Sequence, residues 1–275
     1  KASGGILRRN ITALAGNADP ALDEVDLATG QFRYRLSGSG FSGGIIETLD
    51  SMRIAGWNYD DHKYDDCESP GIKVPTFLAE KDKCRDWGNP LAEMYMEALR
   101  YFAANGNAPI AGFSTGDDST LLSGMGTEAW VDPLSTAEPC AQCAIIVLST
   151  GLNSFDADDL SEVKGLPGIA DVSGIEARTN AVGVAEGLFG IEAIVGNADG
   201  NPNDNSCVPK TLGDFSDVLG MCPELPSLQG SYHLAGLANY AQTTDLRPET
   251  AFEDMQRVDT YTVALAESLP NFIFV

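Results

Sequence analysis

Oxygen-bearing side chains gather in two short segments of the sequence and could bind a hard cation. The later segment contains Asp199, Asn201, Asn203, Asp204 and Asn205, and the earlier one contains Asp156, Asp158 and Asp159. Calcium prefers several oxygens from such short side chains at alternate positions. Neither segment completes an EF-hand loop with its bidentate Glu, and Asp and Asn are also common in plain turns. We expect turns in both segments, with the later one as the better calcium candidate.

Cysteines form a second set of reactive side chains. The six are Cys67, Cys84, Cys140, Cys143, Cys207 and Cys222. An even number in an acidic, loop-rich chain favours disulfides and an exported protein. Proximity favours the pairs Cys67–Cys84, Cys140–Cys143 and Cys207–Cys222, although the sequence alone permits others. The CxxC at Cys140 could instead bind zinc or act in redox chemistry, but we rank both below a structural bridge because no second CxxC or suitably spaced histidine accompanies it.

The sequence offers no convincing catalytic group. Its two histidines, His62 and His233, occur in settings typical of a solvated loop and of a packed or surface helix. Ser149 follows an apolar run but lacks the flanking glycines of a nucleophile elbow. There is no phosphate-binding GxxxxGK[ST] motif and no convincing pair of acids. We therefore expect no enzymatic activity, and no cofactor beyond the candidate calcium ion.

The charge balance excludes several classes of partner. The 275 residues carry 17 Lys and Arg against 40 Asp and Glu, a formal net charge of -23. Such an acidic chain is unsuited to tracking phosphates or binding an anionic membrane surface. Hydrophobic residues nevertheless make up 43% of the chain, which is enough for a packed core. We expect a globular protein with no membrane span and no nucleic-acid partner.

Periodicity predicts the elements that position these residues. Residues 90–104 show helical spacing of apolar side chains, with Asn89 as N-cap. Residues 144–148 form a continuous apolar run that indicates a strand buried on both faces of a parallel sheet. Further elements are expected as a short strand at residues 31–36, a helix from the capping box at Ser173 to Phe189 with Gly190 as its stop, a helix at residues 231–242, and a strand at residues 258–265.

This order of elements indicates an α/β architecture with a parallel sheet. We divide the chain into an irregular N-terminal segment, residues 1–86, with a stapled loop, and an α/β region, residues 87–275, with insertions. Both ends look like interior sequence, so we expect a piece of a longer protein.

Four separate sequence segments resemble segments of one family, in their residues and in their order along the chain. They are residues 87–102 (WGNPLAEMYMEALRYF), residues 143–149 (CAIIVLS), residues 222–238 (CPELPSLQGSYHLAGLA) and residues 257–265 (RVDTYTVAL). Together they resemble the PilC/PilY family of type IV pilus tip-associated proteins. The resemblance implies a von Willebrand factor A-like fold, Rossmann-like with a mainly parallel sheet flanked by helices, incomplete in this chain and interrupted by long disulfide-stapled loops.

The same resemblance implies a function at the cell surface. It implies roles in pilus biogenesis, surface adhesion and twitching motility, at the pilus tip or outer membrane. The implied partners are minor pilins or the tip complex, host or abiotic surfaces, and a C-terminal β-propeller of the same longer chain.

One feature of a von Willebrand A adhesion site is missing. The sequence has no DxSxS motif, the later Thr of the pattern falls near Asn89, and Thr150 replaces the Asp expected after the central strand. Mg²⁺ would lose a charged ligand, so we assign no adhesion-site metal. The alternative function is a calcium-regulated extracellular binding module without a pilus role, with residues 199–205 as its switch.

Overall fold

The computed structural model describes residues 4–33, 44–51, 57–58, 63–64, 89–104, 107–111, 113, 127–134, 141–149, 152–201, 203–223, 226–248, 252 and 254–264. The chain divides into two compact units. The α/β unit comprises Lys1–Gly5, Trp87–Phe113 and Leu134–Val275, and the N-terminal unit comprises Ile6–Asp86 and Ser114–Pro133. This division differs from the predicted one by assigning Ser114–Pro133 to the N-terminal unit and Lys1–Gly5 to the α/β unit.

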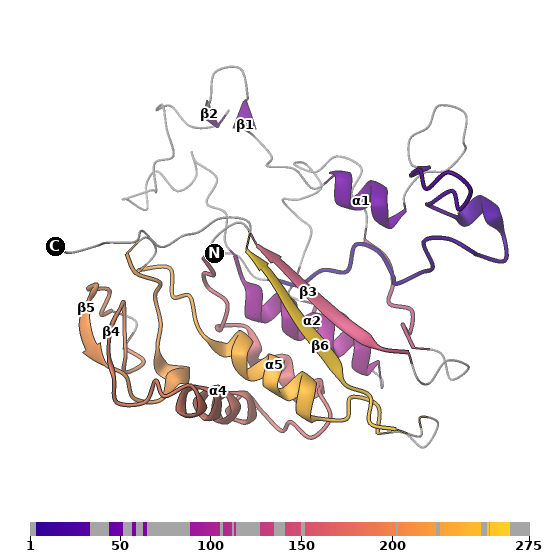
Figure 1. Ribbon diagram of the computed structural model, residues 1–275. Coiled ribbons are helices and arrows are strands. Elements are labelled where there is room, and N and C mark those ends of the chain that lie inside the picture. The colour runs from indigo at the N-terminus through magenta and orange to yellow at the C-terminus, as the bar shows by residue number, and fades with distance from the viewer. Residues whose placement is uncertain are drawn as a thin grey trace. The chain divides into compact units, whose positions relative to one another are not determined.

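Two parallel strands form the centre of the α/β unit. Strand β3 (Cys143–Ser149) pairs residue for residue with strand β6 (Val258–Ala264). Helices α2 (Leu91–Ala103) and α5 (His233–Thr243) pack together and lie along the strand pair (Figure 1). Parallel strands require a crossover connection, which the intervening helices provide. The predicted α/β class with a parallel sheet is confirmed, and the predicted helices and strands at these positions are present.

One face of the strand pair contributes to the main hydrophobic core. Cys143 and Val258 are buried there, and Ile145 and Val147 pack against the same core. The helices supply most of the remaining core side chains, which are Ala92, Tyr95, Met96, Leu99, Phe102, Leu237, Tyr240 and Ala241.

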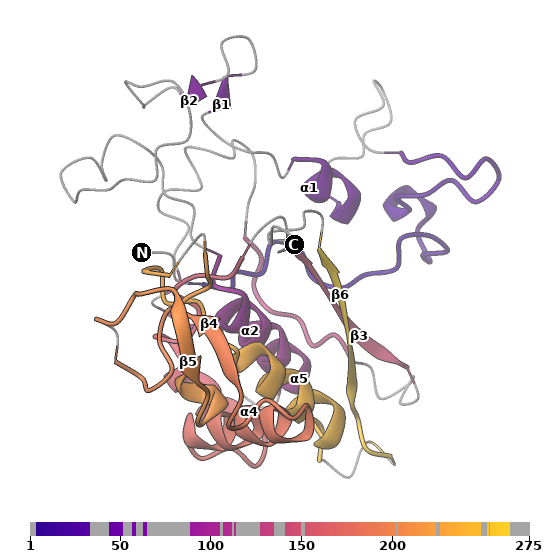
Figure 2. The same cartoon turned by 60° about the vertical axis from the view of Figure 1, so that its left-hand side comes forward.

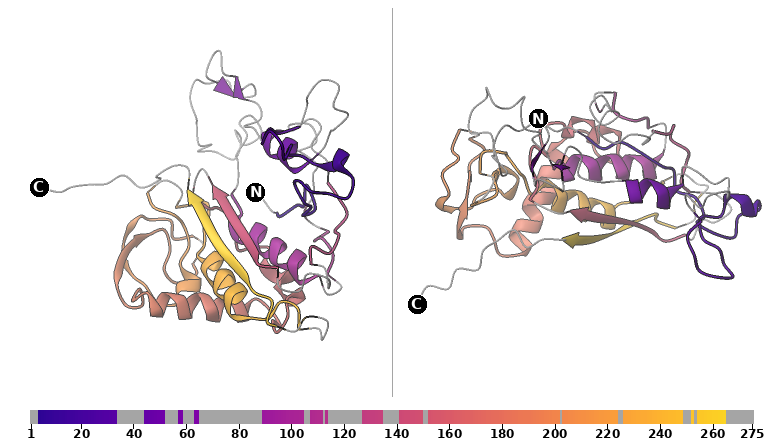
Figure 3. Two further views of the ribbon diagram at one scale, coloured as in Figure 1. Left: turned by 45° about the vertical axis from the view of Figure 1, so that its right-hand side comes forward. Right: turned by 90° about the horizontal axis from the view of Figure 1, so that it is seen from above.

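The expectation that β3 is buried on both faces is wrong. Ile146 and Leu148, which point to the other face, are 67% and 60% exposed. Within the described residues, α2 and α5 both lie on one side of the strands, as the view from above in Figure 3 shows. The apolar run at residues 144–148 therefore has a covered half and an open half.

Helix α4 (Ser173–Ala185) packs against α5, beyond the sheet (Figure 2). The helix ends earlier than predicted, because Gly187 at φ +71° is the glycine that stops it. The Leu188 N–H donates to the Gly183 carbonyl and the Gly187 N–H to the Val184 carbonyl, which is the Schellman pattern.

The capping box predicted at Ser173 does not form. The residue preceding α4 is Val172, which has no side-chain cap. Ser173 lies inside the helix, and its main-chain N–H donates to Asp171 Oδ1 at 3.0 Å. Asp171 thus accepts the hydrogen bond from the Ser173 N–H. In a capping box, that N–H would instead donate to a side chain in the first turn of the helix.

A small antiparallel hairpin follows α4. Strand β4 (Glu192–Val195) pairs with β5 (Val208–Thr211). Among the described residues, short 3-10 helices occur before α4, as η3 (Leu160–Gly165), and after the hairpin, as η4 (Phe215–Asp217). A second, smaller hydrophobic core includes the end of β4 and consists of Val195, Leu212, Phe215 and Val218.

The described part of the N-terminal unit is held by hydrogen bonds and ion pairs more than by a hydrophobic core. It contains η1 (Pro20–Leu22), α1 (Ile45–Ser51), β1 (Trp57–Asn58) and β2 (Lys63–Tyr64). The Glu24 carboxylate accepts the Ile45 and Ile46 N–H groups at 2.7 Å each and so caps α1. Arg9 pairs with Glu128 at 2.7 Å.

The strand predicted at residues 31–36 is reduced to an isolated bridge between Val25 and Phe32, and residues 34–36 lie outside the described residues. None of the described helices is long and apolar enough to cross a membrane.

Candidate functional site

Polar side chains of the α/β unit converge where β3 leaves the sheet, which is the end of a parallel sheet where α/β proteins bind ligands. The Asn89 side-chain amide donates to Ser149 Oγ at 2.9 Å and to the Leu152 carbonyl at 3.1 Å. Its main-chain N–H donates to Ser154 Oγ at 2.9 Å. The prediction of Asn89 as N-cap is wrong, because its amide bonds to the loop after β3 while Pro90 occupies the cap position without a side-chain bond.

Asp156 ties this loop to the start of α5. Its side chain is fully buried, and it accepts hydrogen bonds from the Ser231 N–H and the Asn153 amide, each at 2.7 Å. Burial raises the pKa of Asp156, and these two donors partly oppose the rise. The carboxyl group therefore fixes backbone and is closed to solvent.

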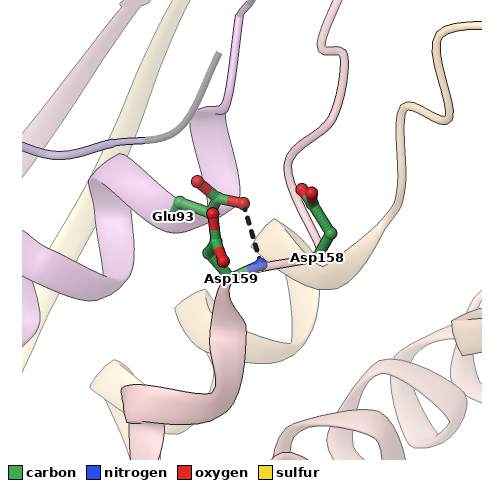
Figure 4. Close-up of side chains that lie close together, drawn as sticks. All are labelled: Glu93, Asp158 and Asp159. Atoms are coloured by element: carbon green, nitrogen blue, oxygen red, sulfur yellow. Dashed lines mark hydrogen bonds between the residues drawn. The ribbon is translucent and has the colours of Figure 1, made fainter. Parts of the chain in front are cut away.

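Glu93 is the centre of a group of three carboxyl groups. It lies in the first turn of α2 with no exposed surface, and Asp158 and Asp159 lie between β3 and η3. One ligand oxygen from each of the three lies within 4.8 Å of the others. Glu93 Oε1 accepts the Asp159 N–H at 3.1 Å, drawn as the dashed line in Figure 4, and Oε2 accepts the Gly4 N–H at 2.9 Å. One side chain thus joins three separate segments of the chain.

The proton balance of this group follows from its burial. Burial, with a smaller contribution from the neighbouring Asp158, raises the pKa of Glu93 to about 8 against the lowering effect of the two backbone N–H groups. Near neutral pH, the Glu93 carboxyl group therefore favours its protonated, neutral form. Carboxylates are ligands that hard cations prefer, but both oxygens of Glu93 already accept backbone N–H groups. The arrangement acts first as a tie between segments.

A second buried acid lies one turn along α2. Glu97 pairs with Arg100 at 2.8 Å, and both side chains are buried. Burial raises the pKa of Glu97 to about 7, with Arg100 opposing the rise. His233 at the start of α5 is also buried, and desolvation lowers its pKa to about 4, so the imidazole is neutral at physiological pH. It is a packed residue, as one of the two sequence interpretations expected.

The predicted calcium segment lies between β4 and β5. Its side chains serve the loop itself: Asp199 Oδ1 accepts the Asn201 N–H at 3.1 Å, Asn201 Oδ1 accepts the Asn203 N–H at 3.1 Å, and Asp204 Oδ1 accepts the Ser206 N–H at 3.2 Å. These are successive Asx turns.

A cation of the protein already lies at one end of this segment. Lys210 Nζ is 2.6 Å from Asp204 Oδ2, and this contact lowers the pKa of Asp204. Calcium binding by Asp199, Asn201, Asn203, Asp204 and Asn205 stays a prediction.

The cysteines follow the predicted pairing in part. Cys207 and Cys222 form a disulfide that closes a loop of sequence separation 15. The predicted Cys140–Cys143 bridge is wrong, because Cys143 is a free, buried thiol at the start of β3. Its side chain points into the core, where burial raises its pKa. Cys67, Cys84, Cys140 and the other histidine, His62, lie outside the described residues.

Sequence reasoning found two members of the carboxyl group and missed the third. Asp158 and Asp159 were candidates, whereas Glu93 and Glu97 were not included in any candidate site. The structure buries both and leaves Met94 49% exposed. The sequence did carry one signal for this burial. In the run from Ala92 to Met96, apolar residues lie on both sides of Glu93, so the apolar surface of the helix is wider than a stripe along one face.

The comparisons with known proteins agree with one another. A family model described as "PilY1 homolog, second domain" matches residues 1–241. The "Type IV pilus biogenesis factor PilY1 homolog" of Xylella fastidiosa strain Temecula1 is 29% identical over 289 residues, which covers 99% of this chain and 18% of that relative. This chain thus spans under a fifth of the length of the curated relative. No solved structure matches the chain.

The family match includes all of the segments that Glu93 and Asp156 hold together, and it extends through most of α5. The carboxyl group and the Cys207–Cys222 loop therefore lie within the matched domain. The chain belongs to the family of PilY1 homologues and matches its second domain.

Proposed function

We propose that this chain is a domain of a type IV pilus biogenesis factor, acting outside the cell at the pilus tip or on the outer membrane. The observation that carries the proposal is the identity of 29% along 99% of the chain to a protein of that name. The relative is several times longer, so the proposed role belongs to the longer protein and this domain contributes contacts to it.

We further propose that the domain works by protein–protein contact without catalysis. The buried acids support this, because Glu93, Asp156 and Glu97 each bind backbone or Arg100 inside the protein. A general acid or base must instead reach a substrate proton directly or through water. The one described histidine, His233, is buried and neutral.

The finer parts of the proposal concern partners. Minor pilins or the tip complex, and host or abiotic surfaces, are the proposed contacts in adhesion and twitching motility. The net charge of -23 supports a partner with a basic face, since complementary charge speeds encounter and disfavours wrong partners. The von Willebrand A-like fold belongs to this proposal, with the parallel β3–β6 pair and its helices as support.

The test is a complementation experiment in a strain that lacks the gene for the full-length protein. The strain receives either the intact gene or one from which only these 275 residues are removed in frame. We expect fewer surface pili by electron microscopy, and smaller twitching zones, with the shortened protein. Immunoblotting of the outer surface must show both proteins at equal amounts, so that loss of export is not mistaken for loss of function. Normal piliation, twitching and adherence with the shortened protein would refute the proposal.

A further inference from the structure

The outer face of the β3–β6 sheet carries a continuous set of large apolar side chains. Ile146 and Leu148 are 67% and 60% exposed, and Tyr261 and Val263 are 56% and 43% exposed. The register places Ile146 beside Tyr261 and Leu148 beside Val263. Because side chains alternate along a strand, all four point away from the core. We call these four residues the outer sheet face.

An exposed apolar face is unusual for a parallel sheet. Parallel strands are almost always covered on both faces, because their crossover connections place helices there. Here α2 and α5 cover the inner face, where Cys143, Val147 and Val258 meet the main core. Among the described helices of the α/β unit, none lies on the other side (Figure 3). An isolated pair of strands is marginally stable at best in water, so this pair depends on what packs against its faces.

We propose that the outer sheet face is a docking surface for another segment of the same longer polypeptide, which covers it with the apolar side of a helix. The proposal concerns how the domain is completed, and it stands independently of a pilus role. Its occupant would be permanent, like the helices of the inner face, because the sheet needs that cover to fold.

The length of the relative supports an occupant from the same polypeptide. This chain aligns with 18% of the Xylella protein, so most of that polypeptide lies outside the aligned segment. The charge of the chain argues against a second copy, because each copy carries a formal charge of -23 and two would repel. Crossover connections, which cover parallel sheets, also belong to one chain.

The direct test is photo-cross-linking in the purified full-length protein. A photoreactive amino acid replaces Ile146, and in a matched control it replaces Val184, which is 61% exposed on α4. We expect position 146 to cross-link within the same polypeptide to a residue outside these 275, as identified by mass spectrometry, and position 184 not to do so. A cross-link from position 146 to a second copy, to another protein or within the 275 residues would overturn the proposal, and so would no cross-link above the control.

A second pair of variants tests whether the face is buried. In the full-length protein, Leu148→Asp would place a charge under the covering helix, whereas Phe189→Asp would place one at a position that is 63% exposed. We expect Leu148→Asp to speed limited proteolysis of this domain at least about tenfold through a larger population of open states, and Phe189→Asp to leave it unchanged. Equal protease resistance of the two variants would mean that the outer sheet face is open to water, which contradicts the proposal.

Discussion

Three acidic side chains, Glu93, Glu97 and Asp156, are buried in the α/β unit and each holds a different part of it together. Glu93 binds the N–H groups of Gly4 and Asp159, and Asp156 binds the N–H of Ser231. Burying a carboxyl group is unfavourable unless hydrogen bonds or a proton compensate. These residues therefore make the stability of the domain depend on pH.

Replacing Glu93 with Gln should flatten this pH dependence. The folded-state pKa of about 8 exceeds the ordinary value of 4.5, so between these values the folded protein holds more protons than the unfolded one. Stability gained from Glu93 is thus full below about pH 4.5 and is lost as pH rises towards 8, by at most about 1.4 kcal/mol per pH unit. Glu93→Gln cannot ionise, and the free energy of unfolding in urea should fall less steeply over that range.

The matched control is Glu186→Gln, which alters an exposed carboxyl group at the end of α4. Glu97 has a pKa of about 7 and contributes a slope of the same sign, so the wild-type slope should shrink in Glu93→Gln without vanishing. Identical slopes for wild type and Glu93→Gln would show that Glu93 is ionised in the folded protein and that its raised pKa is wrong.

At the scale of elements, positions were predictable and ends were not. The helices at α2 and α5 and the strands β3 and β6 follow from the period of their apolar residues, which burial against a common core selects. The caps depend on which donor a side chain reaches in three dimensions. Asn89 reaches the loop after β3, which is far away in the sequence. Asp171 binds the N–H of Ser173 two residues later, a local alternative with which the capping box competes.

The contact between α4 and α5 depends on a glycine. A Cβ built on Gly236 would overlap Thr179 Oγ1 and lie 2.7 Å from the Ile175 carbonyl oxygen, both on α4. Gly236→Ala must push the helices apart, and we expect a loss of about 1–3 kcal/mol in the free energy of unfolding by urea titration. Gly213→Ala is the control, because its Cβ would meet nothing within 4 Å. Equal stability of the two variants would show that the helices separate at no cost.

The whole molecule shows where sequence reasoning reaches its limit. The α/β class and the parallel pair followed from element order, and the Cys207–Cys222 bridge followed from proximity. The exposure of the outer sheet face was not predictable in this way. An apolar run such as residues 144–148 has the same sequence pattern whether one face of the strand is covered or both. The burial of Glu93 also depends on Gly4, a residue far away in sequence. Such tertiary contacts are decided by topology, which periodicity does not encode.

The excess of acid is a property of the whole chain and gives its own prediction. With 17 basic and 40 acidic residues, carboxylates greatly outnumber basic groups, so repulsion should destabilise the folded state. Raising NaCl from about 0.01 M to about 0.15 M shortens the screening length from about 30 Å to about 8 Å, and the thermal midpoint should rise by a few degrees. A falling midpoint would mean that favourable ion pairs, such as Arg9 with Glu128, outweigh the repulsion.

Divalent salts separate this screening from site binding. At equal concentrations, MgCl₂ and CaCl₂ screen charge equally, so repulsion alone predicts the same midpoint in both. A calcium site made by Asp199, Asn201 and Asp204 would add stability in CaCl₂ only, since ligands that bind the folded state stabilise it. The Asx turns and the Lys210 contact already occupy oxygens of that loop, and we therefore expect equal midpoints by differential scanning fluorimetry. An excess in CaCl₂ that disappears in Asp199→Asn would instead establish the loop as a calcium site.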